Sequence, residues 1–490
     1  MATTSVQTYQ NYINGEWRDS VSGVTFPNIN PANNADVVGY FQRSTPDDIH
    51  SAIAAAEHAF PAWRATPAPE RGDIILRAAL LLEQHREELA QLLTREMGKV
   101  IKEARGDIQT AIDFGKFVAG EGRRASGETV PSALRDKMCM TFREPLGVVG
   151  IITPWNFPMA IPAWKTFPAL VAGNTVILKP ASDTPLLATR LVEILADAGL
   201  PHGVLNLVTG PGGILGDTLT SDSRVSMISL TGSTEVGRHI GEICGRDLRR
   251  CALELGGKNA IIIMDDGNLD EAAAAVAWGG FGTTGQRCTA TSRVIVHRKA
   301  LDSFNQRIVA IAQQQKLGNG LDITVDMGPL VNRGRVAAVD EYIDIGKAEG
   351  ARLLVGGRPA RGGDLDNGFF FEPTVFSDVT ADMRIAREEI FGPVLSVIPV
   401  DSYDEAINVA NSTEYGLSCA IFTENSRTAF RAMHDINAGL VYINAGTTGA
   451  EPHLPFGGMK ASGNGHRELG SSAVDEWSEV KTVFVSYPRS

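Results

Sequence analysis

Apolar residues recur at intervals of three or four along the N-terminal part of the chain, as Ile49, Ile53 and Ala56 illustrate. This spacing places them on one face of a helix. A proline and two aspartates favour a helix start just before them, and Gly98 is typical of a helix end. The pattern predicts three helices, which cover residues 44–64, 71–98 and about 99–118.

From residue 147 onward, short aliphatic runs alternate with helical segments. The strand-like runs include "GVVGIITP", "TVILKP", "VLNLV", "VSMISLTG" and "RCALELGG". Strands that alternate with helices through short connections predict a parallel sheet covered on both faces. After Lys258 the alternation restarts with "NAIIIMD" and "RVIVHR", which predicts a second α/β domain.

Two segments outside this rhythm, residues 126–147 and 476–488, also alternate like strands. We expect the C-terminal segment to pair either with residues 126–147 or with another subunit.

The composition narrows the class of protein. The chain has 490 residues, of which 43% are hydrophobic and 21% charged, as in ordinary globular proteins. A net charge of −12 argues against nucleic acid as a partner. Five cysteines without a C-x-x-C pair predict neither a disulfide framework nor a metal site. The N-terminal residues do not resemble a signal peptide and no apolar run is long enough for a membrane span, so we expect a cytoplasmic protein.

Two glycine-rich turns are candidates for a dinucleotide site. "TGPGGILG" contains Gly212 but spaces its glycines one residue too widely for the G-x-G-x-x-G fingerprint. "LTGSTEVG" leads from a strand through Gly232 into a helix that begins at Ser233. A helix N-terminus there would offer free N–H groups to a phosphate. Each motif alone is equally typical of an ordinary turn between a strand and a helix.

Polar residues also follow two predicted strands. Asn156 comes after "GIITP" and Lys179 closes "TVILK". Ligands bind at the carboxyl ends of parallel strands. Asn156 could therefore donate to an oxyanion and Lys179 could bind ribose or phosphate. The alternatives are a turn-forming asparagine and a solvated lysine.

Glu254 and Cys288 are the strongest candidates for chemistry. Glu254 lies in the apolar strand "LELGG", where burial would raise its pKa and suit it to general-base catalysis. Cys288 follows the turn "FGTTGQR" and would need nearby charges or dipoles to be reactive. Taken alone, Cys288 is better interpreted as a small buried core residue than as a nucleophile.

Seven motifs in order give the chain a family resemblance. They are "ITPWNFP", "VILKPAS", "LTGSTEVG", "LELGGKN", "GQRC", "EEIFGPV" and "PFGGMKASG". Together they resemble the aldehyde dehydrogenase superfamily, and the likeness extends over nearly the whole chain. The resemblance favours the interpretation of Cys288 as a nucleophile.

The resemblance implies a catalytic role for five residues. Cys288 would attack the aldehyde carbon, and Asn156 together with the Cys288 N–H would hold the oxyanion. Transfer of hydride to a nicotinamide would leave a thioester, which water activated by Glu254 would hydrolyse. Lys165 and Glu468 resemble residues linked to proton relay, although "GNGHRELG" around Glu468 is one residue longer than the usual family form.

The resemblance also implies the residues of a cofactor site. They are Ile152, Trp155, Lys179, Ser182, Gly212, Gly232, Ser233, Leu255, Glu389 and Phe391. Family members that are strict for NAD often carry a glutamate where this chain has Ser182. A hydroxyl at this position would not repel a 2′-phosphate, so we expect NADP to be favoured, with NAD also accepted.

The substrate is predicted less directly. The C-terminal half and "GQRCTATSRV" are most similar to the α-ketoglutaric semialdehyde (2,5-dioxopentanoate) dehydrogenases. Arg287 could bind a substrate carboxylate bidentately. Alternatively, Arg287 forms an ion pair, and Trp164 and Phe456 line a mostly apolar tunnel for aliphatic or aromatic aldehydes. A CoA-acylating enzyme is a weaker alternative because Glu254 is retained, and a non-catalytic binding protein is disfavoured by the joint presence of Cys288, Glu254 and Asn156.

The implied architecture has a Rossmann-like cofactor domain, an α/β catalytic domain and a β-flap for oligomerisation. The expected boundaries are residues 1–122 and 146–256 for the cofactor domain, 257–470 for the catalytic domain, and 123–145 with 471–490 for the flap. The expected assembly is a homodimer or homotetramer.

Overall fold

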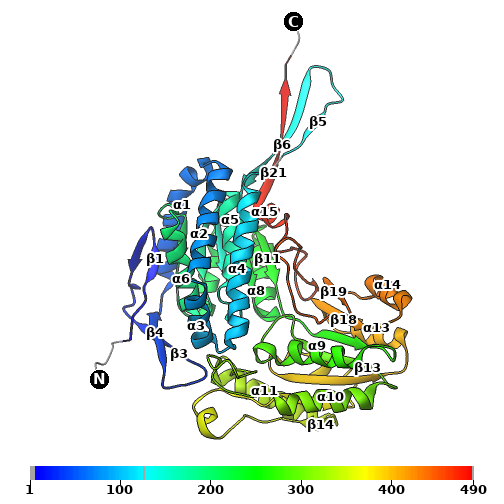
Figure 1. Ribbon diagram of the computed structural model, residues 1–490. Helices are drawn as coiled ribbons and strands as arrows, with labels where there is room; N and C mark the ends of the chain where they lie inside the picture. Colours follow the sequence, from blue (N-terminus) through cyan, green and yellow to red (C-terminus); the bar gives the residue numbers. More distant parts are fainter. Residues whose placement is uncertain (1–5, 125–126, 488–490) are drawn as a thin grey trace.

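The computed structural model describes residues 6–124 and 127–487, in which two seven-stranded sheets form the two halves of the molecule (Figure 1). The first sheet has the order β11-β10-β7-β8-β9-β1-β2. Its five strands from β11 to β9 are parallel, whereas β1 and β2 form an antiparallel edge. The strands are β1 (Asn11–Ile13), β2 (Glu16–Arg18), β7 (Val148–Ile152), β8 (Thr175–Lys179), β9 (Leu205–Leu207), β10 (Val225–Thr231) and β11 (Arg250–Glu254).

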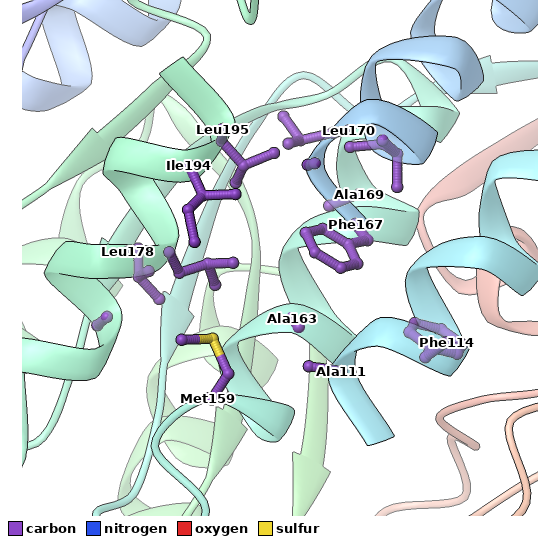
Figure 2. Close-up of a cluster of buried hydrophobic side chains, with 14 of the residues drawn as sticks. Ala111, Phe114, Met159, Ala163, Phe167, Ala169, Leu170, Leu178, Ile194 and Leu195 are labelled. Atoms are coloured by element: carbon purple, nitrogen blue, oxygen red, sulfur yellow. The ribbon is translucent and has the colours of Figure 1, made fainter. Parts of the chain in front are cut away.

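Helices cover both faces of the first sheet. The helices of this half are α1 (Pro46–Ala65), α2 (Ala68–Gln84), α3 (Arg86–Met97), α4 (Ile101–Glu121), α5 (Ala160–Ala172), α6 (Pro185–Asp197), α7 (Gly212–Ser221) and α8 (Thr234–Arg246). In Figure 2, Phe167 and Leu170 of α5 lie between Phe114 of α4 and Leu195 of α6. All four side chains are fully buried, so this layer excludes water behind the strands.

The second sheet has the order β14-β15-β16-β13-β12-β18-β19 and is parallel from β15 to β19. Its strands are β12 (Asn259–Ile263), β13 (Thr291–His297), β14 (Arg352–Val355), β15 (Thr374–Ser377), β16 (Val394–Val400), β18 (Ser418–Phe422) and β19 (Leu440–Ile443). Its helices are α9 (Leu269–Phe281), α10 (Leu301–Gln314), α11 (Arg333–Ala348), α12 (Arg384–Arg387), α13 (Tyr403–Asn411) and α14 (Ser426–Asp435), with 3₁₀ turns η1 (Gly282–Gly285) and η2 (Gly363–Asn367). The chain therefore passes from one sheet to the other between β11 and β12.

A three-stranded arm projects away from both halves (Figure 1). It consists of β5 (Thr129–Pro131), β6 (Lys137–Pro145) and the C-terminal β21 (Ser478–Ser486), with β21 antiparallel to β6. The predicted pairing of the C-terminal strand with the 126–147 segment is confirmed. The parts of the predicted flap at residues 125–126 and 488–490 lie outside the described residues.

Smaller elements complete the fold. They are the hairpin β3 (Thr25–Ile29) and β4 (Val37–Gln42), the pair β17 (Tyr415–Gly416) and β20 (Met459–Lys460), and the short helix α15 (Ala473–Glu476). No helix in the described part of the chain is both long and apolar enough to cross a membrane.

The predicted single helix over residues 71–98 is wrong in one respect. The structure divides it into α2 and α3 at His85, whose φ of −96° and ψ of 10° lie outside the helical range. The apolar periodicity continues through the break, because both helices pack on α4. Gly98 does end α3, in the left-handed conformation with a φ of 96°.

Candidate functional site

A cavity of about 410 Å³ lies where the two halves meet, and it brings together residues predicted from distant parts of the sequence. The predicted residues on its wall are Trp164, Glu254, Leu255, Arg287, Cys288, Phe456 and Glu468. Its size is typical of a site for a small molecule. The lining also includes residues of α4 and the exposed ring of Trp278, which sequence reasoning did not predict.

The loop that carries Cys288 has an unusual backbone. Thr283 and Thr284 adopt φ values of 50° and 58°, in the left-handed region that side chains with a branched Cβ rarely adopt. Gly285 follows at a φ of 68°, and a Cβ there would lie 2.1 Å from the Gly392 carbonyl oxygen. The turn therefore depends on contacts with its surroundings, which must compensate for the strain.

Glu103 of α4 supplies those contacts from inside the protein. Its carboxylate accepts hydrogen bonds from the Thr283 N–H at 2.8 and 3.0 Å and from the Thr283 hydroxyl at 3.2 Å. Arg287 completes the cluster, since it donates to Glu103 at 2.8 Å and to the Thr283 hydroxyl at 3.0 Å. Glu103 and Arg287 are both buried. The ion pair thus fixes the turn immediately before Cys288.

Cys288 itself faces the cavity and is partly buried. Its carbonyl oxygen accepts a hydrogen bond of 2.7 Å from Asn259 Nδ2. Burial, followed by the nearby carboxyls of Glu254 and Glu389, raises the pKa of the Cys288 thiol to about 12, against a smaller lowering by the Thr289 N–H. In this state Cys288 is a thiol that requires a proton acceptor before it can act as a nucleophile.

Asn156 lies behind the Cys288 loop. Its side-chain Nδ2 donates to the Gln286 carbonyl oxygen at 3.0 Å, while its Oδ1 is buried without a hydrogen-bond partner in the described structure. Lys99 holds the Asn156 carbonyl at 2.7 Å and is itself paired with Asp107 at 3.0 Å. Asn156 is beside the loop as predicted, although it is not among the residues that line the cavity.

Glu254 also lines the cavity. It is 4% exposed at the end of β11, and its Oε1 is buried without a hydrogen-bond partner among the described residues. Burial, and then the neighbouring Glu468, raises the pKa of Glu254 well above its usual range. Gly457 makes room for it, because a Cβ at that position would lie 2.6 Å from Oε1. A carboxyl with a free oxygen and a raised pKa is suited to take a proton from water or a thiol.

A buried network continues behind Glu254. Lys165 of α5 donates to Glu468 and, at 2.8 Å, to the Ser229 hydroxyl. Glu468 is held by reciprocal backbone hydrogen bonds with Phe456 of 2.6 and 2.7 Å. The structure adds Glu476 of α15, whose Oε1 is buried and unpartnered among the described residues. Burial, and then Glu468, raises the pKa of Glu476 to about 8.

The predicted cofactor residues of the first half gather at the carboxyl edge of its sheet. Ile152 ends β7, Lys179 ends the adjacent β8, and Ser233 caps α8 by accepting from the Val236 N–H at 3.3 Å. Gly212 is the first residue of α7, and a Cβ there would lie 3.6 Å from Lys179 Nζ. Gly232 donates its N–H to the Glu254 carbonyl at 3.0 Å. The edge thus presents a cation and two helix N-termini, as a phosphate site would require.

Lys179 and Ser182 differ in whether their polar groups already have a bonding partner. Lys179 is 3% exposed, has no ion pair in the described part of the chain, and burial lowers its pKa to about 8. Ser182 donates its hydroxyl to the Gly210 carbonyl at 2.7 Å. Ser182 therefore already has an acceptor, whereas Lys179 forms no ion pair in the described part of the chain, and the acid whose charge acts on it is Asp183.

The remaining cofactor residues form a second group. Trp155 and Phe391 contact each other edge to face, with ring centroids 5.3 Å apart. Glu389 accepts the Gly257 N–H at 2.9 Å, so its carboxylate lies beside the strand connection that leads from Glu254 to the second sheet. Leu255 lies in the same connection and donates its N–H to the Ser462 carbonyl at 2.9 Å.

The three predicted substrate residues all line the cavity. Trp164 and Phe456 contact each other with centroids 5.6 Å apart and form an apolar wall. Arg287 forms the ion pair with Glu103 that was the alternative interpretation, and its guanidinium also lies over the Trp278 ring at 4.7 Å.

Sequence reasoning missed three charged residues, one just before α4 and two within it. Lys99, Glu103 and Asp107 follow one another at intervals of four, and all three are buried. The signal was available, because charged residues spaced along the apolar stripe of a helix are buried only when they are paired.

Comparisons with known proteins show the family of this chain. The sequence profile described as the aldehyde dehydrogenase family matches residues 17–483. An alpha-ketoglutaric semialdehyde dehydrogenase of Bacillus subtilis is 45% identical over 98% of this chain and 99% of its own length. An alpha-ketoglutarate semialdehyde dehydrogenase of Haloferax volcanii is also 45% identical, over 98% of this chain and 99% of its own. Among solved structures, a betaine aldehyde dehydrogenase of Staphylococcus aureus in complex with NAD+ is 36% identical and superposes with a TM-score of 0.96, covering 98% of this chain and 95% of that one.

Proposed function

The chain belongs to the aldehyde dehydrogenase family, and on that premise we propose that it oxidises an acidic semialdehyde of the α-ketoglutaric semialdehyde class, with Cys288 as the nucleophile. The observation that carries the catalytic roles is the shared cavity. Cys288 and Glu254 both line it, and Oε1 of Glu254 has no hydrogen-bond partner among the described residues. The substrate class is supported by the identity to the two semialdehyde dehydrogenases.

The first step forms a covalent bond to the aldehyde. Cys288 loses its thiol proton to solvent that enters the cavity, and Sγ then bonds the carbonyl carbon. The carbonyl oxygen becomes an oxyanion, to which the Cys288 N–H and the second N–H of Asn156 Nδ2 would donate. A bound nicotinamide supplies the chemistry of a hydride acceptor. Loss of hydride from the thiohemiacetal carbon leaves a thioester on Cys288.

The second step releases the acid. Glu254 removes a proton from water, the resulting hydroxide bonds the thioester carbon, and the carbon–sulfur bond breaks so that Cys288 recovers its electron pair. The proton taken by Glu254 leaves through the neighbouring network, in which Lys165 donates to Glu468. Loss of the Glu254 carboxylate would stop this hydrolysis step while leaving the first step intact.

The residues at the carboxyl edge of the first sheet fit a dinucleotide. The N-termini of α7 and α8 would hold the pyrophosphate through Gly212 and Ser233, with Ile152 and Trp155 beside the adenosine and Leu255 and Gly232 nearby. Glu389 and Phe391 would hold the nicotinamide ribose and ring. The support for NADP over NAD is Lys179, because it forms no ion pair among the described residues and a 2′-phosphate would pair with it. Position 182 itself carries a hydroxyl and not a carboxylate that would repel this phosphate, although the carboxylate of Asp183 acts on Lys179. Ser182 would help to bind this phosphate only if its hydroxyl gave up its hydrogen bond to the Gly210 carbonyl and donated to the phosphate instead.

The two sheets and the arm suggest separate roles. We assign cofactor binding to residues 1–122 and 146–256, catalysis to 257–470, and oligomerisation to 123–145 and 471–490. The arm supports this division, because exposed Met138, Phe142 and Phe484 give it apolar faces that a second subunit of a dimer or tetramer would cover.

The apolar wall of Trp164 and Phe456 favours a second candidate, a broad-specificity enzyme for uncharged aliphatic and aromatic aldehydes. Steady-state kinetics with α-ketoglutaric semialdehyde and pentanal, each with NADP+ and NAD+, separates the candidates. We expect kcat/KM at least tenfold higher for the semialdehyde, and higher with NADP+ than with NAD+. Equal or greater kcat/KM with pentanal would overturn the proposal of an acidic substrate. A strong preference for NAD+ would overturn the proposed role of Lys179 in binding NADP+.

A further inference from the structure

The cationic side chains around the cavity each form an ion pair with a carboxylate, with one exception. Arg287 is paired with Glu103. Two more buried cations, Lys99 and Lys165, are paired with Asp107 and Glu468.

The exception is Lys102 of α4, which lines the cavity and has no ion pair with any residue in the described ranges 6–124 and 127–487. The remaining acid on the wall is Glu254, and its raised pKa favours the neutral form. Lys102 therefore gives this part of the cavity its unmatched positive charge.

The position of Lys102 suits a residue at the entrance. Its side chain is exposed, and its Nζ lies 5.5 Å from the ring centroid of Trp278, which is itself 45% exposed on the cavity wall. Gly106, one turn further along α4, also lines the cavity, and a Cβ added there would meet no atom within 4 Å. Open space thus adjoins an exposed ammonium group in the cavity that Cys288 also lines.

Arg287 is less suited to the same task. Its charge is already matched by a buried carboxylate, and its Nε is engaged with the Thr283 hydroxyl. If Arg287 turned toward a substrate, Glu103 would be left as an unpaired buried charge and the strained turn before Cys288 would lose a support, which is costly. The structure therefore places Arg287 as a positioning residue for the Cys288 loop.

We propose that Lys102 is the specificity-determining cation, which attracts and binds the carboxylate of the substrate at the end remote from the aldehyde. The inference rests on the proposed function and adds a residue to it. An exposed cation at the mouth of an apolar cavity raises the encounter rate of anions and then pairs with the bound carboxylate, and both effects weaken as salt screens the charge. No bond to substrate forms or breaks at Lys102.

The test compares Lys102→Met, which keeps the length of the side chain without its charge, with Lys102→Arg, which keeps a charge. Lys116→Met is the matched control, because Lys116 is an exposed lysine of the same helix that pairs with Glu83 and does not line the cavity. For each protein the ratio of kcat/KM for α-ketoglutaric semialdehyde to kcat/KM for pentanal is measured from low to high ionic strength.

We expect the ratio to fall about tenfold in Lys102→Met, mainly through KM for the acidic substrate, which corresponds to about 1.4 kcal/mol. Lys102→Arg and Lys116→Met should stay within about threefold of the wild type. The wild-type ratio should decline with salt, and that decline should disappear in Lys102→Met. A ratio and salt dependence in Lys102→Met equal to those of the wild type would overturn the role of Lys102. A wild type that does not prefer the semialdehyde would instead overturn the proposed substrate.

Discussion

Two groups of buried charged residues border the cavity, and they differ in how completely their polar atoms are hydrogen-bonded. The group beside Cys288, which we term the anchor cluster, consists of Lys99, Glu103, Asp107, Thr283 and Arg287. Both carboxylates there accept hydrogen bonds from a backbone N–H as well as from a cation, since Asp107 also accepts the Ala160 N–H at 2.8 Å. Its charges balance in pairs.

The second group surrounds Glu254, and we term it the base cluster. It consists of Lys165, Ser229, Glu254, Glu468 and Glu476. It holds three carboxyls and one lysine, and the Oε1 atoms of Glu254 and Glu476 are unpartnered among the described residues. Three carboxylates and one ammonium group cannot all stay charged in a buried site, so this cluster retains protons at neutral pH.

The contrast separates two physical tasks. A fully bonded network has one low-energy arrangement, so the anchor cluster can hold the strained turn before the nucleophile. A network with unmatched oxygens can gain and lose protons at little structural cost, as a base and its relay must. The comparison predicts that variants of the base cluster impair catalysis more than stability, and that variants of the anchor cluster do the reverse.

The largest expected effect is that of Glu254→Gln on turnover. We expect kcat to fall about 10³-fold, because general-base catalysis of thioester hydrolysis is lost. The first turnover should survive as a burst of reduced cofactor equal to one per Cys288, measured by stopped-flow absorbance. The melting temperature should not fall, since the change removes a buried carboxyl whose Oε1 has no hydrogen-bond partner among the described residues. A kcat within tenfold of the wild type would contradict the assignment.

The next effect is that of Glu103→Gln on stability. It leaves Arg287 buried without a counter-charge, and we expect the free energy of unfolding to fall by about 3 kcal/mol in urea titrations. The double variant Glu103→Gln, Arg287→Met should recover part of that loss, because it removes the stranded charge as well. A double variant less stable than Glu103→Gln alone would show that the ion pair does not account for the loss.

The smallest effect is a pH dependence of stability at Glu476. Because its folded pKa is raised to about 8, Glu476 stays protonated in the folded protein at pH values where the unfolded chain has lost that proton. Stability from this group is present below its ordinary pKa and is lost as pH rises toward 8. Glu476→Gln should therefore match the wild type at pH 5 and melt about 1–3 °C higher at pH 9. Equal melting temperatures at pH 9 would contradict the raised pKa of Glu476.

Much of the fold could be predicted from the chain because its elements follow local rules. Ser233 and Gly98 mark helix ends through their own side-chain and backbone properties, and aliphatic runs such as Val148–Ile152 form parallel strands. The break at His85 could not be predicted, because the apolar periodicity runs through it without interruption.

The sequence by itself determined the catalytic candidates, since Cys288, Glu254 and Asn156 stand in short motifs whose meaning does not depend on distant contacts. Only the tertiary structure decided which charges remain available. It paired Arg287 with Glu103, a residue that lies far from it in the chain. In the described structure it left Lys102 without an ion pair, and it left Oε1 of Glu254 and Oε1 of Glu476 without hydrogen-bond partners. The physical reason is that the charge state and reach of a side chain depend on burial and on its neighbours in space, which a linear pattern does not record.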